Sequence, residues 1–266
     1  LVRPMAVVVD TSSEMVYVAD PGARGIHRFD LRGSSYKLLY RENNLPLTSP
    51  TGMALGPEQR VFITDSSLGR LFVATPEVDF LSPVELQSEL QQPTGVVFDQ
   101  ETGQLYIVDT SAHAIKVFSG TGAFIRQFGR RGSGPGEFNF PTALWQDRSG
   151  QLLDSDSLNF RIQRFNTRGE FISQFGQAGD ARGDLSRPKG VATDRSGHIY
   201  VVDAMFHAFQ IFDATGELLF MLGSQGHEAG EFWLPTDIFI AADDSIYLSH
   251  SHNQPVQIFR YIGGEP

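Results

Sequence analysis

The chain has 266 residues and is acidic, with 21 lysines and arginines against 31 aspartates and glutamates and a formal net charge of −10. Nucleic-acid binding draws its affinity from lysine and arginine, so this balance argues against nucleic acid as the main partner. Hydrophobic residues, at 41%, suffice for a large core, and no apolar run reaches the roughly 18 to 20 residues of a membrane span. The lack of cysteine excludes disulfides, thiolate metal sites and a cysteine nucleophile.

A repeat runs through the whole sequence. Prolines fall at positions 4, 50, 93, 141, 188 and 235, at spacings of 46, 43, 48, 47 and 47 residues. Each proline is followed 15 or 16 residues later by one member of a column: Asp20, Asp65, Asp109, Asp156, Asp203 and His250. A fixed period of this length is typical of repeat architectures, so six units are expected, with starts near residues 3, 49, 92, 140, 187 and 234. We expect residues 1–266 to form a single domain.

Helical periodicity is nearly absent from the units. One segment, Ser82-Pro83-Val84-Glu85, has the serine, proline and glutamate of a helix start. A short helix through Leu90 and a strand followed by a loop are both consistent with this segment.

The third unit shows the pattern of four short strands most clearly. Val96–Phe98 and Leu105–Val108 are β-branched and aromatic runs, and Ile115–Phe118 and Phe124–Phe128 follow after further turns. Six antiparallel units of this kind predict an all-β fold, a six-bladed β-propeller whose blades close around a central channel. The sixth unit ends seven residues after Phe259, too soon for its fourth strand, so we expect an N-terminal extension in the natural protein to supply that strand.

The repeat resembles the NHL repeat. The resemblance is carried by Pro188–Asp203 with Gln210–Asp213 and Leu222-Gly223, and again by Leu158–Phe165; it covers all six units and is strongest from residue 93 onward. It implies a six-bladed propeller similar to bacterial NHL proteins of the exported and lipoprotein type. On that basis we expect a periplasmic or membrane-anchored location, with a lipid anchor upstream of this chain as one means of attachment.

The topology of such blades predicts that the signature segments share one face of the disc, which we call the top face. If each unit begins with the innermost strand, the turn after the column residue and the link to the next blade lie on the same side. An aspartate that recurs in every blade favours a structural role, because its carboxylate accepts backbone N–H bonds of the turn that follows.

Function is expected where top-face residues depart from the repeat. The departures are Arg24, Arg70, Asn159, Arg161, Lys189, Phe206, Trp233 and Asp237. Lys189 replaces the threonine of four other units, and Asp237 replaces a small residue. Such a mixture is typical of a surface that binds a protein, a peptide or a small ligand. Ordinary variation of weakly constrained loops is the alternative.

Histidines on the top face support a second interpretation. His250 replaces the column aspartate, His252 follows it, and His113 and His207 each lie four residues after a column aspartate. Neutral imidazole is a common ligand of zinc, so three of these side chains around the channel would hold one divalent ion. That site would be similar in kind to peptidyl-hydroxyglycine amidating lyase, a six-bladed propeller with a histidine-bound channel metal, although no ligand position can be transferred. Ordinary exposed turn histidines are the alternative.

Asp154 stands where other blades have an apolar strand residue, so its carboxyl must be paired, hydrated or shifted in pKa. With Asp156 and Asn159 it superficially resembles a calcium loop, but the required glycine and glutamate are missing. A tolerated local defect is the alternative.

The sequence contains no motif that indicates catalysis. It has no Gly-x-Ser-x-Gly element, and Gly132–Gly136 does not match a dinucleotide-binding fingerprint. We therefore expect a non-catalytic binding or interaction module without a cofactor, acting through the top face and channel mouth. The alternative is a metal-dependent lyase or hydrolase with one divalent ion, Zn or Ca, in the channel. The oligomeric state is not indicated.

Overall fold

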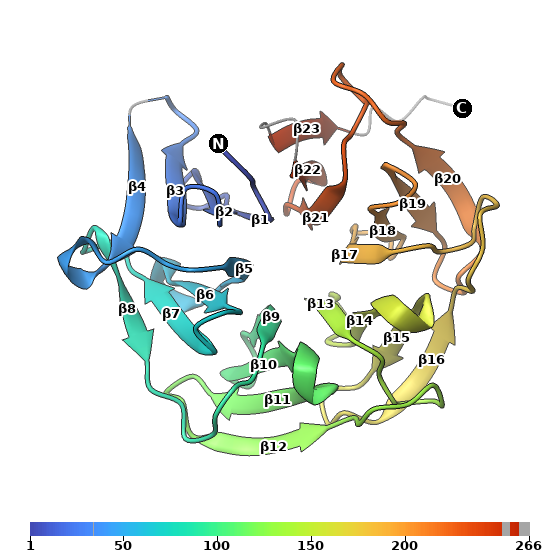
Figure 1. Ribbon diagram of the computed structural model, residues 1–266, viewed down its shortest axis with the longest axis horizontal. Coiled ribbons are helices and arrows are strands. Elements are labelled where there is room, and N and C mark those ends of the chain that lie inside the picture. The colour runs from blue at the N-terminus through green and yellow to red at the C-terminus, as the bar shows by residue number, and fades with distance from the viewer. Residues whose placement is uncertain (34, 252–255, 261–266) are drawn as a thin grey trace.

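The computed structural model describes residues 1–33, 35–251 and 256–260, which form β-sheet blades arranged in a ring around a central axis (Figure 1). Within each blade the strands form an antiparallel meander from the channel outwards. The predicted all-β propeller of four-stranded antiparallel blades is confirmed. In the described part of the chain, no helix is both long and apolar enough to cross a membrane.

The first three blades along the chain contain four strands each. Blade 1 is β1 (Ala6–Asp10), β2 (Met15–Asp20), β3 (Gly25–Asp30) and β4 (Tyr36–Arg41); blade 2 is β5 (Pro50–Leu55), β6 (Val61–Asp65), β7 (Arg70–Ala74) and β8 (Phe80–Val84); blade 3 is β9 (Pro93–Asp99), β10 (Gln104–Asp109), β11 (Ala114–Ser119) and β12 (Phe124–Phe128). Short 3-10 helices η1 (Glu42–Asn44), η2 (Pro57–Gln59) and η3 (Thr110–Ala112) lie between these strands.

The last three blades have the same order of strands. Blade 4 is β13 (Pro141–Gln146), β14 (Leu152–Asp156), β15 (Arg161–Phe165) and β16 (Phe171–Phe175), with η4 (Ser157–Asn159) after β14; blade 5 is β17 (Pro188–Thr193), β18 (Ile199–Asp203), β19 (Ala208–Phe212) and β20 (Leu218–Leu222); blade 6 is β21 (Pro235–Ile240), β22 (Ser245–His250) and β23 (Val256–Arg260). Among the described residues, β23 pairs with β22 alone. Ring closure by an upstream strand stays a prediction, because residues 261–266 lie outside the described part.

The segment with the helix-start pattern forms a strand. Ser82 and Pro83 lie in β8 and pair with Val73 and Phe72 of β7, so the strand interpretation is confirmed and the helix is wrong. A helix this short cannot offset its nucleation cost, whereas pairing satisfies the same backbone groups. Strand β8 also pairs in parallel with β4, which joins blades 1 and 2 into one eight-stranded sheet.

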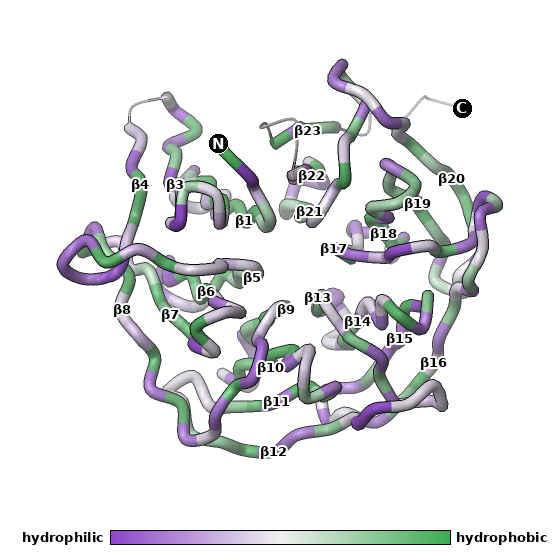
Figure 2. The backbone as a smooth tube through the Cα atoms, in the orientation of Figure 1, coloured by the Kyte–Doolittle hydropathy of each residue, from purple (hydrophilic) through white to green (hydrophobic). Residues whose placement is uncertain are grey.

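The hydrophobic core is divided among the interfaces between neighbouring blades. Between blades 4 and 5, for example, buried Leu153 and Ile162 pack against Val191 and Val201. Each blade is covered on both faces, which explains near-continuous apolar runs such as Leu105–Val108. Figure 2 accordingly shows hydrophobic segments in every blade.

Candidate functional site

The repeated aspartates join each blade to the segment that precedes its inner strand. Asp203 is fully buried, and its carboxylate accepts backbone N–H bonds from Ser186 at 2.7 Å, from Arg187 at 2.9 Å, and from Met205 in the following turn at 3.0 Å. Asp65 accepts amides from both sides in the same way. The structural interpretation of the column is confirmed. These carboxylates are occupied by the scaffold and are not free ligands.

His113 and His207 also bind backbone. Their Nδ1 atoms accept the amide hydrogens of Phe140 at 3.2 Å and Leu234 at 3.1 Å, each the residue before the next blade's proline. Each histidine therefore connects its own blade to the next one. His113 is buried, which differs from the expected exposed turn histidine.

His250 is enclosed within blade 6. Its side chain is fully buried, its Nδ1 has no hydrogen-bond partner among the described residues, and its Nε2 lies 3.4 Å from the Gln257 amide. Burial lowers the pKa of His250 from 6.5 to about 4, with a smaller contribution from His227. The imidazole is therefore neutral at physiological pH.

The buried neutral His250 predicts an acid-sensitive fold. His250 binds a proton more tightly in the unfolded chain than in the folded one. The contribution of neutral His250 to the free energy of unfolding is therefore present above about pH 6.5 and is lost as pH falls through 4. Replacing His250 with glutamine is expected to flatten the stability profile between pH 7 and 4 in urea titrations. An unchanged slope would show that His250 does not cause the acid sensitivity.

The described histidines do not fit one metal ion. His113 and His207 are committed to backbone amides in blades 3 and 5, while His250 is enclosed in blade 6. Within residues 1–33, 35–251 and 256–260 there is no group of three or more histidine, aspartate or glutamate side chains placed to hold an ion. His252, the remaining candidate, lies outside the described residues.

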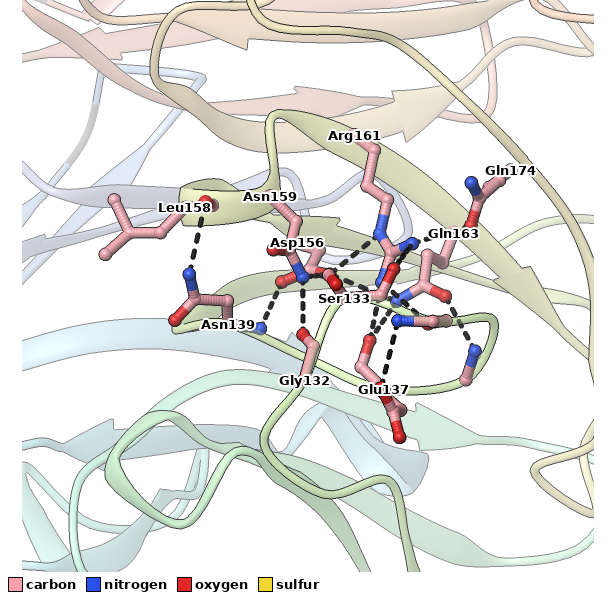
Figure 3. Close-up of polar contacts among 12 residues, drawn as sticks. Gly132, Ser133, Glu137, Asn139, Asp156, Leu158, Asn159, Arg161, Gln163 and Gln174 are labelled. Atoms are coloured by element: carbon pink, nitrogen blue, oxygen red, sulfur yellow. Dashed lines mark hydrogen bonds and ion pairs between the residues drawn. The ribbon is translucent and has the colours of Figure 1, made fainter.

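Arg161 lies in a buried network between blades 3 and 4 rather than on an open surface (Figure 3). Its guanidinium donates to the Asp156 carboxylate at 2.9 Å, and also to the main-chain carbonyl oxygens of Ser133, Gly134 and Glu137 at 2.8 to 2.9 Å. The Gln174 side chain accepts a further bond. Arg161 therefore holds the loop that links blades 3 and 4, and its donors are not available to a ligand.

Two further candidates serve the scaffold. The Asn159 amide donates to Gly132 O and to the Asp156 carboxylate, and Arg24 Nε donates to Leu47 O at 3.1 Å. Asp154 does not form an ion site with Asp156 and Asn159. It is fully buried, and neither of its carboxyl oxygens has a partner among the described residues. Burial raises the pKa of Asp154 well above its usual value.

A column of loop anchors escaped the sequence analysis. Gln163, Gln210 and Gln257 each lie seven residues after a column residue. Each accepts an amide hydrogen from the preceding interblade loop and donates to a carbonyl of that loop, as Gln210 does with Gly183 N and Asp184 O at 2.8 Å. Lys116 takes this position in blade 3 and donates to Glu89 O. The constant spacing of seven residues was the available signal.

The channel mouth contains a cavity of about 380 Å³ on the top-face side of the inner strands. The residue directly after each repeat proline lines it: Met5, Thr51, Thr94, Thr142, Lys189 and Thr236. In blade 5 the strand register shifts between Pro188 and Val191, so Lys189 lies in a bulge, a feature that redirects side chains. Of the eight binding candidates, Lys189 and Asp237 line this cavity together.

The other candidates lie elsewhere. Arg70 is exposed at the start of β7, Phe206 is half-buried in the turn after Asp203, and the Trp233 ring packs on His227 with 5.2 Å between ring centroids. None of these side chains lines the cavity.

Lys189 and Asp237 both line the cavity wall, but they do not form an ion pair. The half-buried Lys189 ammonium has neither a hydrogen bond nor an ion pair with any described residue. Burial and the neighbouring Arg187 lower its pKa, while Asp203 opposes the shift. The Asp237 carboxyl accepts the amide hydrogens of Val7, at 3.2 Å, and Ile238, and burial nevertheless raises its pKa to about 7.

Asp237 stands where the neighbouring inner strand requires glycine. A Cβ added to Gly190 would lie 2.7 Å from the Asp237 Cα, because adjacent inner strands approach closely at this position. In blade 6 the carboxyl group of the larger side chain accepts the amide hydrogen of Val7 in blade 1. Asp237 therefore also joins the last blade to the first.

The ring of blades and its lined channel define a β-propeller, and comparisons with known proteins agree. Residues 88–176 match the family model DUF5128, described as a 6-bladed beta-propeller. An alignment 145 residues long, which covers 49% of this chain, is 27% identical to mouse peptidyl-glycine alpha-amidating monooxygenase, and an alignment of 109 residues with the rat protein is 28% identical. The chain spans only 14% and 11% of the length of these relatives.

Solved structures share the fold at low sequence identity. Virginiamycin B lyase from Staphylococcus aureus superposes with a TM-score of 0.68 and 14% identity, covering 99% of this chain and 86% of that one. A Bacteroides thetaiotaomicron protein of unknown function gives a TM-score of 0.73 at 14% identity, covering 96% and 68%. A chain of a nidogen/laminin complex gives 0.68 at 22% identity, covering 85% and 81%. Likeness at these identities establishes the fold alone.

Proposed function

We propose that the chain is a non-catalytic binding module that takes a ligand in the cavity at its channel mouth. The observation that carries the proposal is Lys189, a half-buried ammonium without a partner among the described residues, inside a cavity of about 380 Å³. Burying a cation without a partner is unfavourable, so a ligand that pairs with it gains affinity at this position. The cavity volume falls within the roughly 300 to 1,000 Å³ of small-molecule sites.

Further support comes from the walls of the cavity. The large apolar side chains of Phe140 and Leu158 line it while remaining 37% and 42% exposed, which leaves apolar surface for a ligand to cover. Metal-dependent lyase or hydrolase chemistry lacks comparable support, because the described histidines have structural roles. From the NHL resemblance we also propose an exported location.

A variant that fills the channel tests the proposal. Thr51 lines the cavity, and replacing it with tryptophan is expected to abolish binding of compounds found by ligand-observed NMR with a fragment library of mixed charge. Thr121→Trp is the matched control, because Thr121 is exposed in the turn between β11 and β12 on the opposite face and does not line the cavity. Equal binding by both variants, or no fragment binding to the wild-type protein, would refute the proposed function.

A further inference from the structure

We propose that the ligand of the channel cavity is an organic monoanion, a carboxylate attached to an apolar, preferably aromatic, group. This inference rests on the proposed function and specifies the chemistry of its ligand. Lys189 supplies the charge that pairs with the carboxylate, and the side of the cavity formed by Phe140 and Leu158 receives the apolar group.

The cationic side of the cavity is formed by blade 5. Lys189 lies in the channel wall, and the exposed Arg187, two residues earlier, lines the mouth above it. Asp203, the acid whose charge acts on the Lys189 pKa, is fully occupied by backbone amides and does not form an ion pair with Lys189. An anion that enters the cavity therefore meets an available ammonium rather than one already neutralised by a carboxylate. Partial burial makes that attraction stronger than it would be at an exposed lysine.

The apolar side of the cavity is held in place. Phe140 has a φ of +55°, a left-handed conformation that is costly for an aromatic residue. His113 supports it twice, because its Nδ1 accepts the Phe140 amide hydrogen and its ring packs edge-to-face on the Phe140 ring with 4.7 Å between centroids. Leu158 extends the same surface from the turn after Asp156. A preorganised aromatic surface lowers the entropic cost of binding an apolar group.

Phosphate esters and other dianions fit the cavity less well. The channel threonines offer few free donors, because Thr51 Oγ1 donates to Pro93 O, Thr236 Oγ1 contacts Pro4 O, and Thr94 and Thr142 bond to neighbouring hydroxyls. Asp237 adds an acid to the same cavity. Lys189 is the one cation in the channel wall, with an acid nearby and with Arg187 exposed at the mouth, and this set matches one negative charge, whereas phosphate sites provide several converging donors.

Matched aromatic probes test the inference by calorimetry or NMR titration. Phenylacetate is expected to bind about tenfold more tightly than the neutral phenylacetamide, since a hydrogen bond to a charged group adds this much. Phenethylamine and phenyl phosphate should bind more weakly than phenylacetate. The peptide Gly-Gly-Phe and its C-terminal amide separate the two sources of such a carboxylate: a free-acid preference in this pair identifies a peptide C-terminus, and binding of phenylacetate alone identifies a small acid.

Variants of Lys189 connect the preference to one side chain. Lys189→Gln is expected to remove the preference for the acid while leaving the affinity for phenylacetamide unchanged, and Lys189→Arg is expected to retain the preference. Lys37→Gln is the control, because Lys37 is exposed on β4 and paired with Asp79. A merely structural Lys189 would weaken both probes equally.

The outcomes separate this inference from the proposed function. Equal binding of acid and amide, a preference for the amine or the phosphate, or an acid preference that survives Lys189→Gln would overturn the carboxylate inference. If fragments of other chemistry still bind and Thr51→Trp blocks them, the binding module stands and only the ligand class is wrong. Failure of all probes and fragments would refute both.

Discussion

Replacing Asp154 with leucine is expected to stabilise the protein by about 2 kcal/mol at pH 7, because a buried carboxyl without partners carries an uncompensated desolvation cost. The corresponding residues of blades 3 and 5 are Ile107 and Val201, both fully buried and apolar. Asp154→Val is the control for overpacking by leucine, because it introduces the smaller side chain that blade 5 has at this position. Urea unfolding measures the change.

The stability gained by Asp154→Leu should depend on pH in a defined direction. Burial raises the folded-state pKa of Asp154 well above its usual value, so the folded chain holds this proton more tightly than the unfolded chain does. The wild-type contribution is therefore fully present below about pH 4 and is lost as pH rises through the folded pKa. The advantage of the leucine variant should be larger at pH 8 than at pH 4. A constant gain, or destabilisation by both replacements, would contradict this account of Asp154.

Removing Arg161 is expected to produce the largest loss, about 3 to 5 kcal/mol of unfolding free energy for Arg161→Ala. The substitution leaves the buried Asp156 carboxylate without its ion pair and removes the donor to three loop carbonyl oxygens. Arg164→Ala is the control on the same strand, because Arg164 is only half-buried, and its loss should be within about 0.5 kcal/mol.

A conservative variant keeps the Arg161 prediction measurable if the alanine variant does not fold. Arg161→Lys retains the charge but has a single donor group, so an intermediate loss is expected. If Arg161→Ala and Arg164→Ala lose equal amounts of stability, the network in Figure 3 does not hold the interblade loop.

The repeat made the architecture predictable. The prolines begin inner strands β5, β9, β13, β17 and β21, and the column residues end the second strands, as at Asp203. Both features are local and recur, so a single sequence reveals them. The parallel pairing of Tyr40 with Phe80 has no such signal, because it occurs once and joins residues distant in sequence.

The site was predictable only in part. Lys189 and Asp237 were found because each interrupts a regular position near the start of the inner strand, and the position of Lys189 lines the cavity in every blade. Arg161 looked equally unusual, yet its strand position directs it into the loop network. Whether a polar side chain faces a ligand or a neighbouring backbone depends on interblade packing, which the repeat alone does not specify. Phe140 was missed because neither its exposure nor its left-handed backbone conformation has a signal in the repeat.

Ligand binding in the channel can be tested directly with methionine methyl NMR, because the chain has five methionines in distinct places. Met5 and Met53 line the cavity, whereas Met15 begins β2 and Met221 lies on the outer strand β20. With 13C-methyl methionine and phenylacetate, the account predicts saturable shifts of Met5 and Met53 and unchanged Met15 and Met221 signals. In Lys189→Gln the same shifts should need about tenfold more phenylacetate to saturate. Saturation of the protein with shifts confined to Met15 or Met221, or no shift at any methionine, would contradict a ligand site in the channel.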